Sequence, residues 1–150
     1  MTAVVVRDGR LLHGADPARV WALVADPART EEWAPVYSAG YLGTELPGVG
    51  HTVFVRLHRF TDPTNALRFR IVEWDAGHRY RCEIDGIKVG TEHQLDVIVR
   101  AEVDAGSPAA DLELRYSADV PSSWASPVRW WVRSRLARAV AGVEKLVGDH

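Results

Sequence analysis

Residues 127–148 read PVRWWVRSRLARAVAGVEKLVG, and this stretch decides the fold of the chain. Its apolar residues recur every three or four positions, a spacing that gathers side chains on one face of an α-helix. That face consists of Val128, Trp131, Val132, Leu136, Ala139, Val140, Val143 and Val147. Ser126-Pro127 is typical of a helix start and Gly148 of a helix end. We therefore predict a helix from about Pro127 to Val147, roughly 30 Å long, which is enough to cross a small domain.

Upstream of this helix, apolar and polar residues alternate along several segments. The clearest examples are Leu67–Ile71, Arg79–Ile84, His93–Val103 and Leu112–Val120. Combinations that favour turns, such as Asp85-Gly86, separate these segments. Alternation of this kind indicates antiparallel strands that have one apolar face and one polar face.

Two shorter helices are predicted before these strands. Asp16-Pro17 and Asp26-Pro27 each combine a capping carboxylate with a proline suited to the first helical position. The order is therefore strand, helix, helix, about six strands and a long helix, in a single α+β domain over residues 1–150. The apolar face of this sheet of about seven strands must be covered, and the final helix is the element long enough to cover it. A curved antiparallel sheet wrapped around one helix rarely packs solid, so we predict an internal cavity for a small molecule.

Composition argues against several classes of function. The net charge is −2 and the pattern contains no basic face, which argues against nucleic-acid binding. The histidines are scattered and Cys82 is the one cysteine, so we expect neither a metal site nor an intrachain disulfide. No segment resembles a signal peptide or is long enough to span a membrane. We expect a cytoplasmic protein that is a monomer or a homodimer. We also expect that it uses no cofactor, since no glycine-rich phosphate loop opens a helix.

Several short motifs carry a resemblance to a known family. They are ADPARVWALVADP at 15–27, WAP at 33–35, PGVG at 47–50 and RIVEWD at 70–75, followed by the closing helix. With these motifs the chain resembles the START-domain-like helix-grip superfamily (SRPBCC), and within it the polyketide cyclase/dehydrase and lipid-transport branch. The resemblance covers nearly the whole chain. Its motifs are caps, turns and packing residues, so they imply a fold and do not imply one particular reaction.

The resemblance implies an apolar or aromatic ligand held in the cavity. The first hypothesis is a cofactor-free enzyme that cyclises or dehydrates a polyketide-like substrate. The second is a carrier that binds a lipid or aromatic metabolite without changing it. The third is a module that regulates a partner protein through Trp130 and the arginine-bearing face of the long helix.

Three residues are candidates for proton transfer in the enzyme hypothesis. His93 shares the parity of the apolar residues on its strand, so it should point inward, either as a general acid or base or as a histidine at the cavity rim. Tyr116 also points inward by parity, either to bond a ligand carbonyl or to serve as a structural tyrosine. Glu73 continues the parity of its strand but borders a turn, where a carboxylate is more often exposed than buried, and a buried carboxylate there would need a partner such as Arg135.

The candidate ligand-binding residues come from the same parity and from the ends of the predicted elements. They are Trp33, Tyr37, Phe69, Tyr80, Leu95, Val97, Leu114, Trp124, Trp131 and Arg135. Arg135 lies beside the apolar stripe of the long helix, where it could reach a ligand carboxylate, phosphate or enolate, or extend outward to water. Cys82 is predicted to point inward from an apolar strand, which argues against a nucleophilic role, and Trp21 is predicted to be core.

Overall fold

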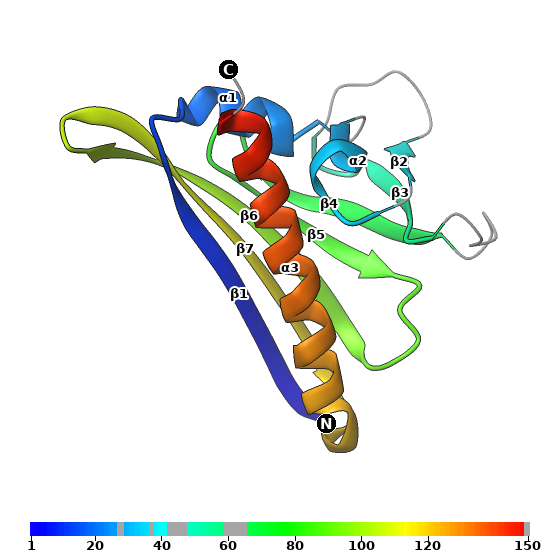
Figure 1. The fold of residues 1–150 in the computed structure, drawn as a ribbon. Helices are drawn as coiled ribbons and strands as arrows, with labels where there is room; N and C mark the ends of the chain where they lie inside the picture. Colours follow the sequence, from blue (N-terminus) through cyan, green and yellow to red (C-terminus); the bar gives the residue numbers. More distant parts are fainter. Residues whose placement is uncertain (27–28, 37, 42–47, 59–65, 149–150) are drawn as a thin grey trace.

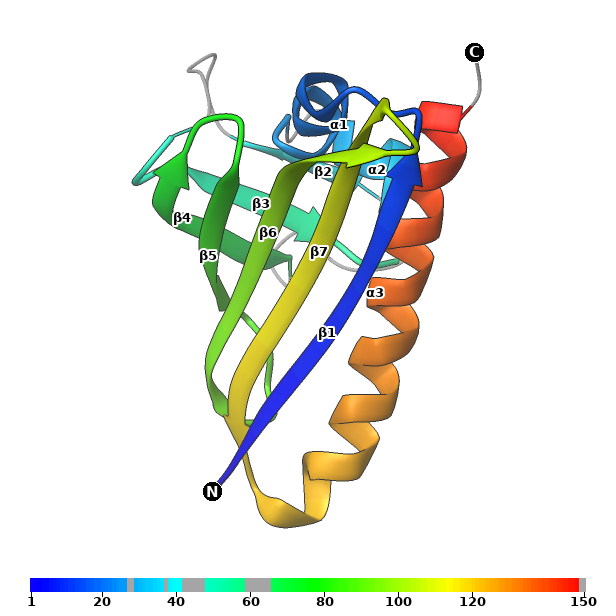
Figure 2. The ribbon, with the colours of Figure 1, turned by 90° about the vertical axis from the view of Figure 1, so that its left-hand side faces the viewer.

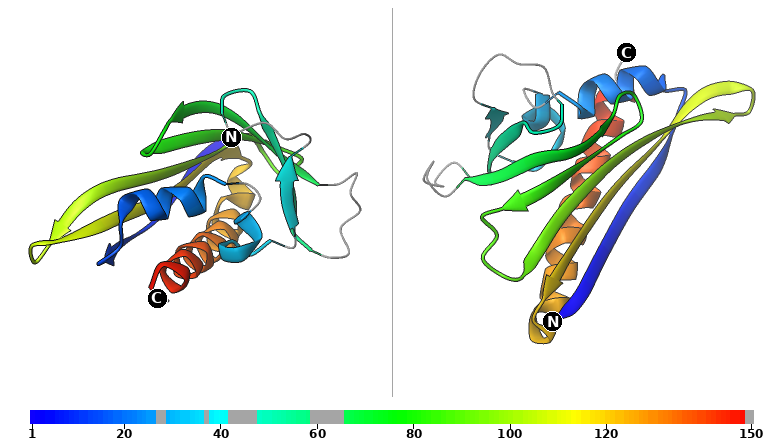
Figure 3. Two further views of the ribbon diagram at one scale, coloured as in Figure 1. Left: turned by 90° about the horizontal axis from the view of Figure 1, so that it is seen from above. Right: turned by 180° about the vertical axis from the view of Figure 1, so that it is seen from behind.

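The computed structural model describes residues 1–26, 29–36, 38–41, 48–58 and 66–148. It contains a seven-stranded antiparallel sheet in the order β1-β7-β6-β5-β4-β3-β2. The strands are β1 (Thr2–His13), β2 (Ser38–Tyr41), β3 (Thr52–Arg56), β4 (Leu67–Asp75), β5 (Arg79–Asp85), β6 (Thr91–Asp104) and β7 (Ser107–Val120). The helices are α1 (Pro17–Val24), α2 (Thr30–Trp33), the 3-10 helix η3 (Ser122–Trp124) and α3 (Ala125–Gly148). The sheet curls around α3, so the predicted α+β helix-grip fold is confirmed (Figures 1 and 3).

The long helix α3 is seated on one half of the sheet. Its contacts with the sheet lie mainly on β1 and β7. Figure 2 shows α3 running beside β1, while β5 and β4 lie progressively farther from it. Its buried side chains are Ala125, Val132, Leu136, Ala139, Val140, Val143 and Val147, in agreement with the predicted apolar stripe. The sheet therefore diverges from the helix on the side of β3, β4 and β5.

The start of α3 differs from the prediction. The helix begins at Ala125, directly after η3, and Ser126-Pro127 lies inside its first turn. Proline is tolerated there because the first N–H groups of a helix have no intrahelical acceptor. The Ser126-Pro127 pair therefore locates the start of the helix to within two residues, and the helix begins earlier because it continues directly from the 3-10 helix η3.

The long β6–β7 hairpin supplies the centre of the sheet. Its two-residue turn places Ala105 at φ 49° and Gly106 at φ 80°, the pair of positive angles that suits the twist of a tight hairpin. Along β7, every second side chain from Ala110 to Val120 is buried, as the alternation of the sequence predicts. The apolar face of this hairpin forms the floor under α1 and α3.

Two irregularities change the direction of side chains in the sheet. The pairing of β4 with β5 shifts between Ile71 and Glu73, and the pairing of β6 with β7 shifts between Thr91 and Gln94. In the second shift Glu92 adopts a φ of 58°. Because side chains alternate along a strand, an extra residue reverses which of the following side chains face the helix.

The two short helices close the upper end of the fold. Asp16 caps α1 as predicted, because its side chain accepts from the N–H of Ala18 at 3.0 Å. The second predicted start, Asp26-Pro27, falls partly outside the described residues, and the helix that follows begins at Thr30. The last residue of α2, Trp33, packs closely on α3 at Gly142, where a Cβ atom would lie 2.2 Å from the carbonyl oxygen of Trp33.

This close approach makes Gly142 a sharp test of the α2–α3 contact. We expect Gly142→Ala to lower the free energy of unfolding by about 1–3 kcal/mol, because the added methyl group must push backbone atoms apart. Gly148→Ala is the matched control on the same helix, since its Cβ would meet nothing within 4 Å. Urea unfolding of both variants measures the difference, and equal stability of the two would contradict this account of the packing.

Candidate functional site

An apolar cavity lies where the sheet diverges from α3. Its volume is about 170 Å³, and α2, α3 and the strands β3, β4 and β5 supply most of its wall. Of the described residues that line it, none belongs to β1. The strands contribute inward-facing side chains that include Val53, Val55, Leu67, Phe69, Ile71, Cys82 and Ile84. A protein cavity of about 150 Å³ with a similar wall holds benzene, so this space fits one aromatic ring or a short apolar chain.

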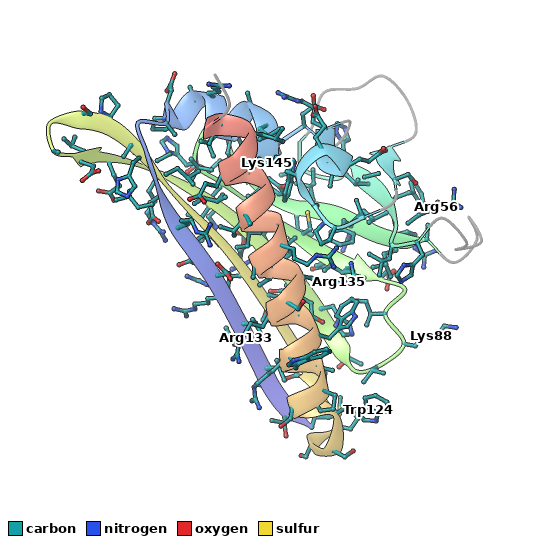
Figure 4. All side chains as sticks on the ribbon, in the orientation of Figure 1. Arg56, Lys88, Trp124, Arg133, Arg135 and Lys145 are labelled. Atoms are coloured by element: carbon teal, nitrogen blue, oxygen red, sulfur yellow. The ribbon has the colours of Figure 1, made fainter. Side chains whose placement is uncertain are left out.

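Most of the residues predicted to contact a ligand lie on this wall. They are Trp33, Phe69, Tyr80, Leu95, Leu114, Trp131 and Arg135. Val97 is fully buried in the core and does not line the cavity, because the cavity does not extend along β6 beyond Leu95. Trp124 is 48% exposed at the lower end of α3 and lies outside the cavity (Figure 4). Tyr37 lies outside the described residues.

Glu73 does not point into the cavity, so the parity prediction is wrong at this residue. The bulge after Ile71 turns the Glu73 side chain to the outer face of the sheet. There its carboxylate pairs with Arg79 at 3.3 Å and Arg81 at 3.4 Å, and it is not paired with Arg135. A carboxylate on this face cannot reach a ligand held under α3.

The same bulge brings Trp74 into the cavity wall, a residue that the sequence pattern did not single out. Its ring stacks on Tyr80 with centroids 5.6 Å apart and meets Trp21 edge-on at 5.3 Å. Trp21 is therefore half-buried in an aromatic cluster and is not a plain core residue. The signal for Trp74 was its aromatic type beside a turn, but strict alternation assigned it to the outer face.

Tyr116 and His93 form a hydrogen-bonded pair in the wall. The Tyr116 hydroxyl lies 2.5 Å from Nδ1 of His93, and both residues are buried. Tyr116 lines the cavity, whereas His93 lies behind it and borders a second, polar hollow that includes Arg70 and Gln94. Burial raises the pKa of Tyr116 to about 12, so the phenol is protonated at neutral pH. The other ring nitrogen of His93, Nε2, is buried without a hydrogen-bond partner among the described residues.

The remaining polar groups of the wall are largely occupied by the protein itself. The Tyr80 hydroxyl donates to the carbonyl oxygen of Val24 at 2.8 Å, and burial raises the pKa of this phenol. Burial, followed by the nearby Asp96, raises the pKa of the Cys82 thiol to about 12. Nε1 of Trp33 is buried without a partner among the described residues. The wall thus offers a ligand few free polar contacts.

Arg135 is the one charged side chain among the described residues that line the cavity. Its Nη1 donates to the carbonyl oxygen of Pro35 at 2.8 Å, and its guanidinium carbon lies 4.4 Å from the ring centroid of Trp131. Trp131 lines the cavity and is also 42% exposed, so these residues mark the mouth. Burial, followed by the neighbouring Arg138, lowers the pKa of Arg135. Figure 4 shows Arg135 extending from α3 toward the strands, away from Arg133.

The half-barrel sheet, the gripped helix and the apolar cavity between them define the class of the protein as a START-like helix-grip domain. The chain belongs to the polyketide cyclase/dehydrase and lipid transport family, whose model matches residues 6–148. No curated protein matches the sequence. Among the described residues, no cluster of side chains is suited to hold a metal ion, and no helix has the length and apolar character to cross a membrane.

Solved structures share the fold at low sequence identity. XoxI from Bacillus cereus has a TM-score of 0.77 at 12% identity, with 97% of this chain and 96% of that chain covered. A solution structure from Thermobifida fusca has a TM-score of 0.78 at 18% identity, covering 96% and 93%. Norcoclaurine synthase from Thalictrum flavum, in complex with dopamine and hydroxybenzaldehyde, has a TM-score of 0.72 at 15% identity, covering 99% and 88%. These likenesses establish the shared fold.

Cys82 reports on the wall of the cavity, because it is the one cysteine of the chain and is buried. With a pKa of about 12, roughly one thiol in ten thousand is ionised at pH 8. We expect iodoacetamide to alkylate native Cys82 at least about 100-fold more slowly than the same thiol in urea. Mass spectrometry of timed samples measures both rates, and similar rates would contradict the burial of this side chain.

Proposed function

We propose that the chain binds an apolar or aromatic carbonyl compound in this cavity and catalyses a cofactor-free cyclisation or dehydration of it. The observation that carries the proposal is the Tyr116–His93 pair, set into a wall that is otherwise almost entirely apolar. In such a dry site a hydrogen bond to a carbonyl oxygen is stronger than in water. The pair is therefore placed where it can favour charge that develops on a ligand oxygen.

The proposed chemistry needs a proton at the electrophilic oxygen. In an intramolecular aldol step, the enol carbon of a dicarbonyl unit bonds to a carbonyl carbon of the same molecule. The oxygen of that carbonyl takes the Tyr116 proton, while His93, hydrogen-bonded to Tyr116 through Nδ1, holds the phenolate oxygen in place. The phenolate then takes the proton of the enol hydroxyl as that group becomes a ketone, which restores Tyr116 and balances the step, and loss of water from the new alcohol completes the ring.

Two further observations support this proposal. The cavity walls restrict a flexible chain to few conformers, and such confinement alone can lower a barrier by several kcal/mol. Norcoclaurine synthase is structurally similar and holds dopamine and hydroxybenzaldehyde, so this fold accommodates aromatic carbonyl compounds.

A carrier of a lipid or aromatic metabolite is the second candidate. Two observations favour it, because both reduce the number of polar groups that are free to react with a ligand. The hydroxyl of Tyr80 and Nη1 of Arg135 already donate to carbonyl oxygens of the protein. The Glu73 carboxylate points away from the cavity. A wall with few free polar groups can hold an apolar molecule without reacting with it. A regulatory module that acts through Trp130 has less support, although this side chain is 73% exposed. Such a module needs no ligand cavity, whereas here side chains leave an internal space of about 170 Å³ unfilled.

Binding in the cavity is tested by filling it. We expect native mass spectrometry of the purified protein to detect a bound small molecule, and Ala139→Leu to abolish that species because residue 139 lines the cavity. Ala141→Leu is the matched control, since residue 141 is exposed on the same helix. If both variants retain the ligand equally, the cavity is not the binding site.

Turnover is tested by removing single hydroxyl groups. The substrate is heptane-2,4,6-trione, a short chain that yields a single aromatic ring on cyclisation, and loss of one water is followed by mass spectrometry. We expect Tyr116→Phe to lower kcat at least about 100-fold, because it removes the proton donor. Tyr80→Phe is the control, because its hydroxyl is bonded to Val24, and we expect it to change kcat by less than about threefold. Ligand binding with no turnover by the unmodified protein would favour the carrier.

A further inference from the structure

Arg135 differs from Arg79, Arg81 and Arg115, which are also half-buried, in having no carboxylate partner among the described residues. Arg81 pairs with Asp96 at 2.9 Å, and Arg115 pairs with Glu113 at 2.7 Å. Arg135 has a single hydrogen bond, to the carbonyl oxygen of Pro35, and makes no ion pair with the residues that the structure describes. A guanidinium that has lost part of its hydration normally has an anion nearby, because an unpaired charge is costly to desolvate.

The surroundings of Arg135 increase this need for an anion. The charge that acts on it is a second cation, Arg138, and the cavity beside it is apolar. Trp131 covers one face of the guanidinium. Because Nη1 is bonded to Pro35, the edge formed by Nε and Nη2 is left for a further acceptor. This edge presents two parallel N–H groups, which match the two oxygens of a carboxylate.

We propose that the natural ligand is an amphipathic carboxylic acid, whose apolar body fills the cavity and whose carboxylate pairs with Arg135 at the mouth. This inference rests on the proposed function, because it requires that the cavity binds a ligand. The pairing fixes the direction of the ligand, with the charged end beside Trp131 and the apolar end under α3. A carboxylate fits better than a phosphate, since one guanidinium edge balances a single negative charge.

The test uses three probes that share a phenyl ring and differ in the head group. They are 4-phenylbutanoate, 4-phenylbutanamide and 3-phenylpropyl phosphate, titrated while tryptophan fluorescence is recorded at neutral pH and low salt. We expect the carboxylate to bind at least about tenfold more tightly than the amide. We expect Arg135→Gln to weaken carboxylate binding by about 10- to 100-fold, and to leave amide binding within about twofold.

Controls separate the charge of Arg135 from its structural contact with Pro35. Arg133→Gln removes an exposed arginine of the same helix that lies away from the cavity, and it should leave all affinities within about twofold. Arg135→Lys keeps the charge without the planar edge and should give intermediate carboxylate affinity. Urea unfolding confirms that each variant is folded under the conditions of the titration.

Each other outcome counts against the inference in a distinguishable way. Equal binding of carboxylate and amide by the unmodified protein would overturn the carboxylate assignment but leave the cavity as a binding site. An equal loss of carboxylate and amide binding in Arg135→Gln would likewise overturn the carboxylate assignment and leave the cavity as a binding site. Tighter binding of the phosphate, lost in Arg135→Gln, would replace the carboxylate with a phosphate. Failure of all three probes to bind would overturn both this inference and the proposed function.

Discussion

The contact of α3 with β1 and β7 is the constraint on which the rest of the structure depends. The apolar stripe of α3 is buried against this half of the sheet, and the strong curvature of the sheet then carries β3, β4 and β5 away from the helix. A helix is straight over this length and a twisted sheet is not, so the two surfaces cannot stay in contact everywhere. The cavity is the space that results, and α2 closes it from above by packing on α3 at Gly142.

The chemistry available in the cavity follows from how its few polar groups are satisfied. Burial keeps the phenol of Tyr116 and the thiol of Cys82 protonated at neutral pH. Among the polar side chains of the wall, Tyr116 is distinguished by its partner, since its hydroxyl meets a ring nitrogen of the buried His93. The Tyr80 hydroxyl donates to the backbone carbonyl oxygen of Val24 instead, which fixes the direction of this hydroxyl.

The mouth of the cavity and the outer face of the sheet differ in how their charged side chains are paired. On the outer face of the sheet, arginines and carboxylates alternate and neutralise one another, as Glu73, Arg81 and Asp96 do. At the mouth, Arg135 lies beside an apolar wall without such a partner among the described residues. The same residue type is therefore a structural ion-pair member in one place and a candidate ligand contact in the other.

The sequence by itself determined the order of the elements, the helix-grip fold and several residues of the cavity wall. Periodicity was sufficient for Leu114, Phe69 and Trp131, because burial on one face of a strand or helix repeats with the geometry of the backbone. Local signals also located the cap at Asp16. These features depend on residues close together along the chain.

Only the tertiary structure decided the direction of Glu73, the inclusion of Trp74 in the wall and the partners of His93 and Arg135. A bulge requires an extra residue relative to the neighbouring strand, and a single sequence does not reveal the register between two strands. The Tyr116–His93 bond crosses from one strand to another, and the bond from Arg135 to Pro35 joins residues 100 positions apart. Such contacts depend on how distant segments meet, which the local pattern of residues does not specify.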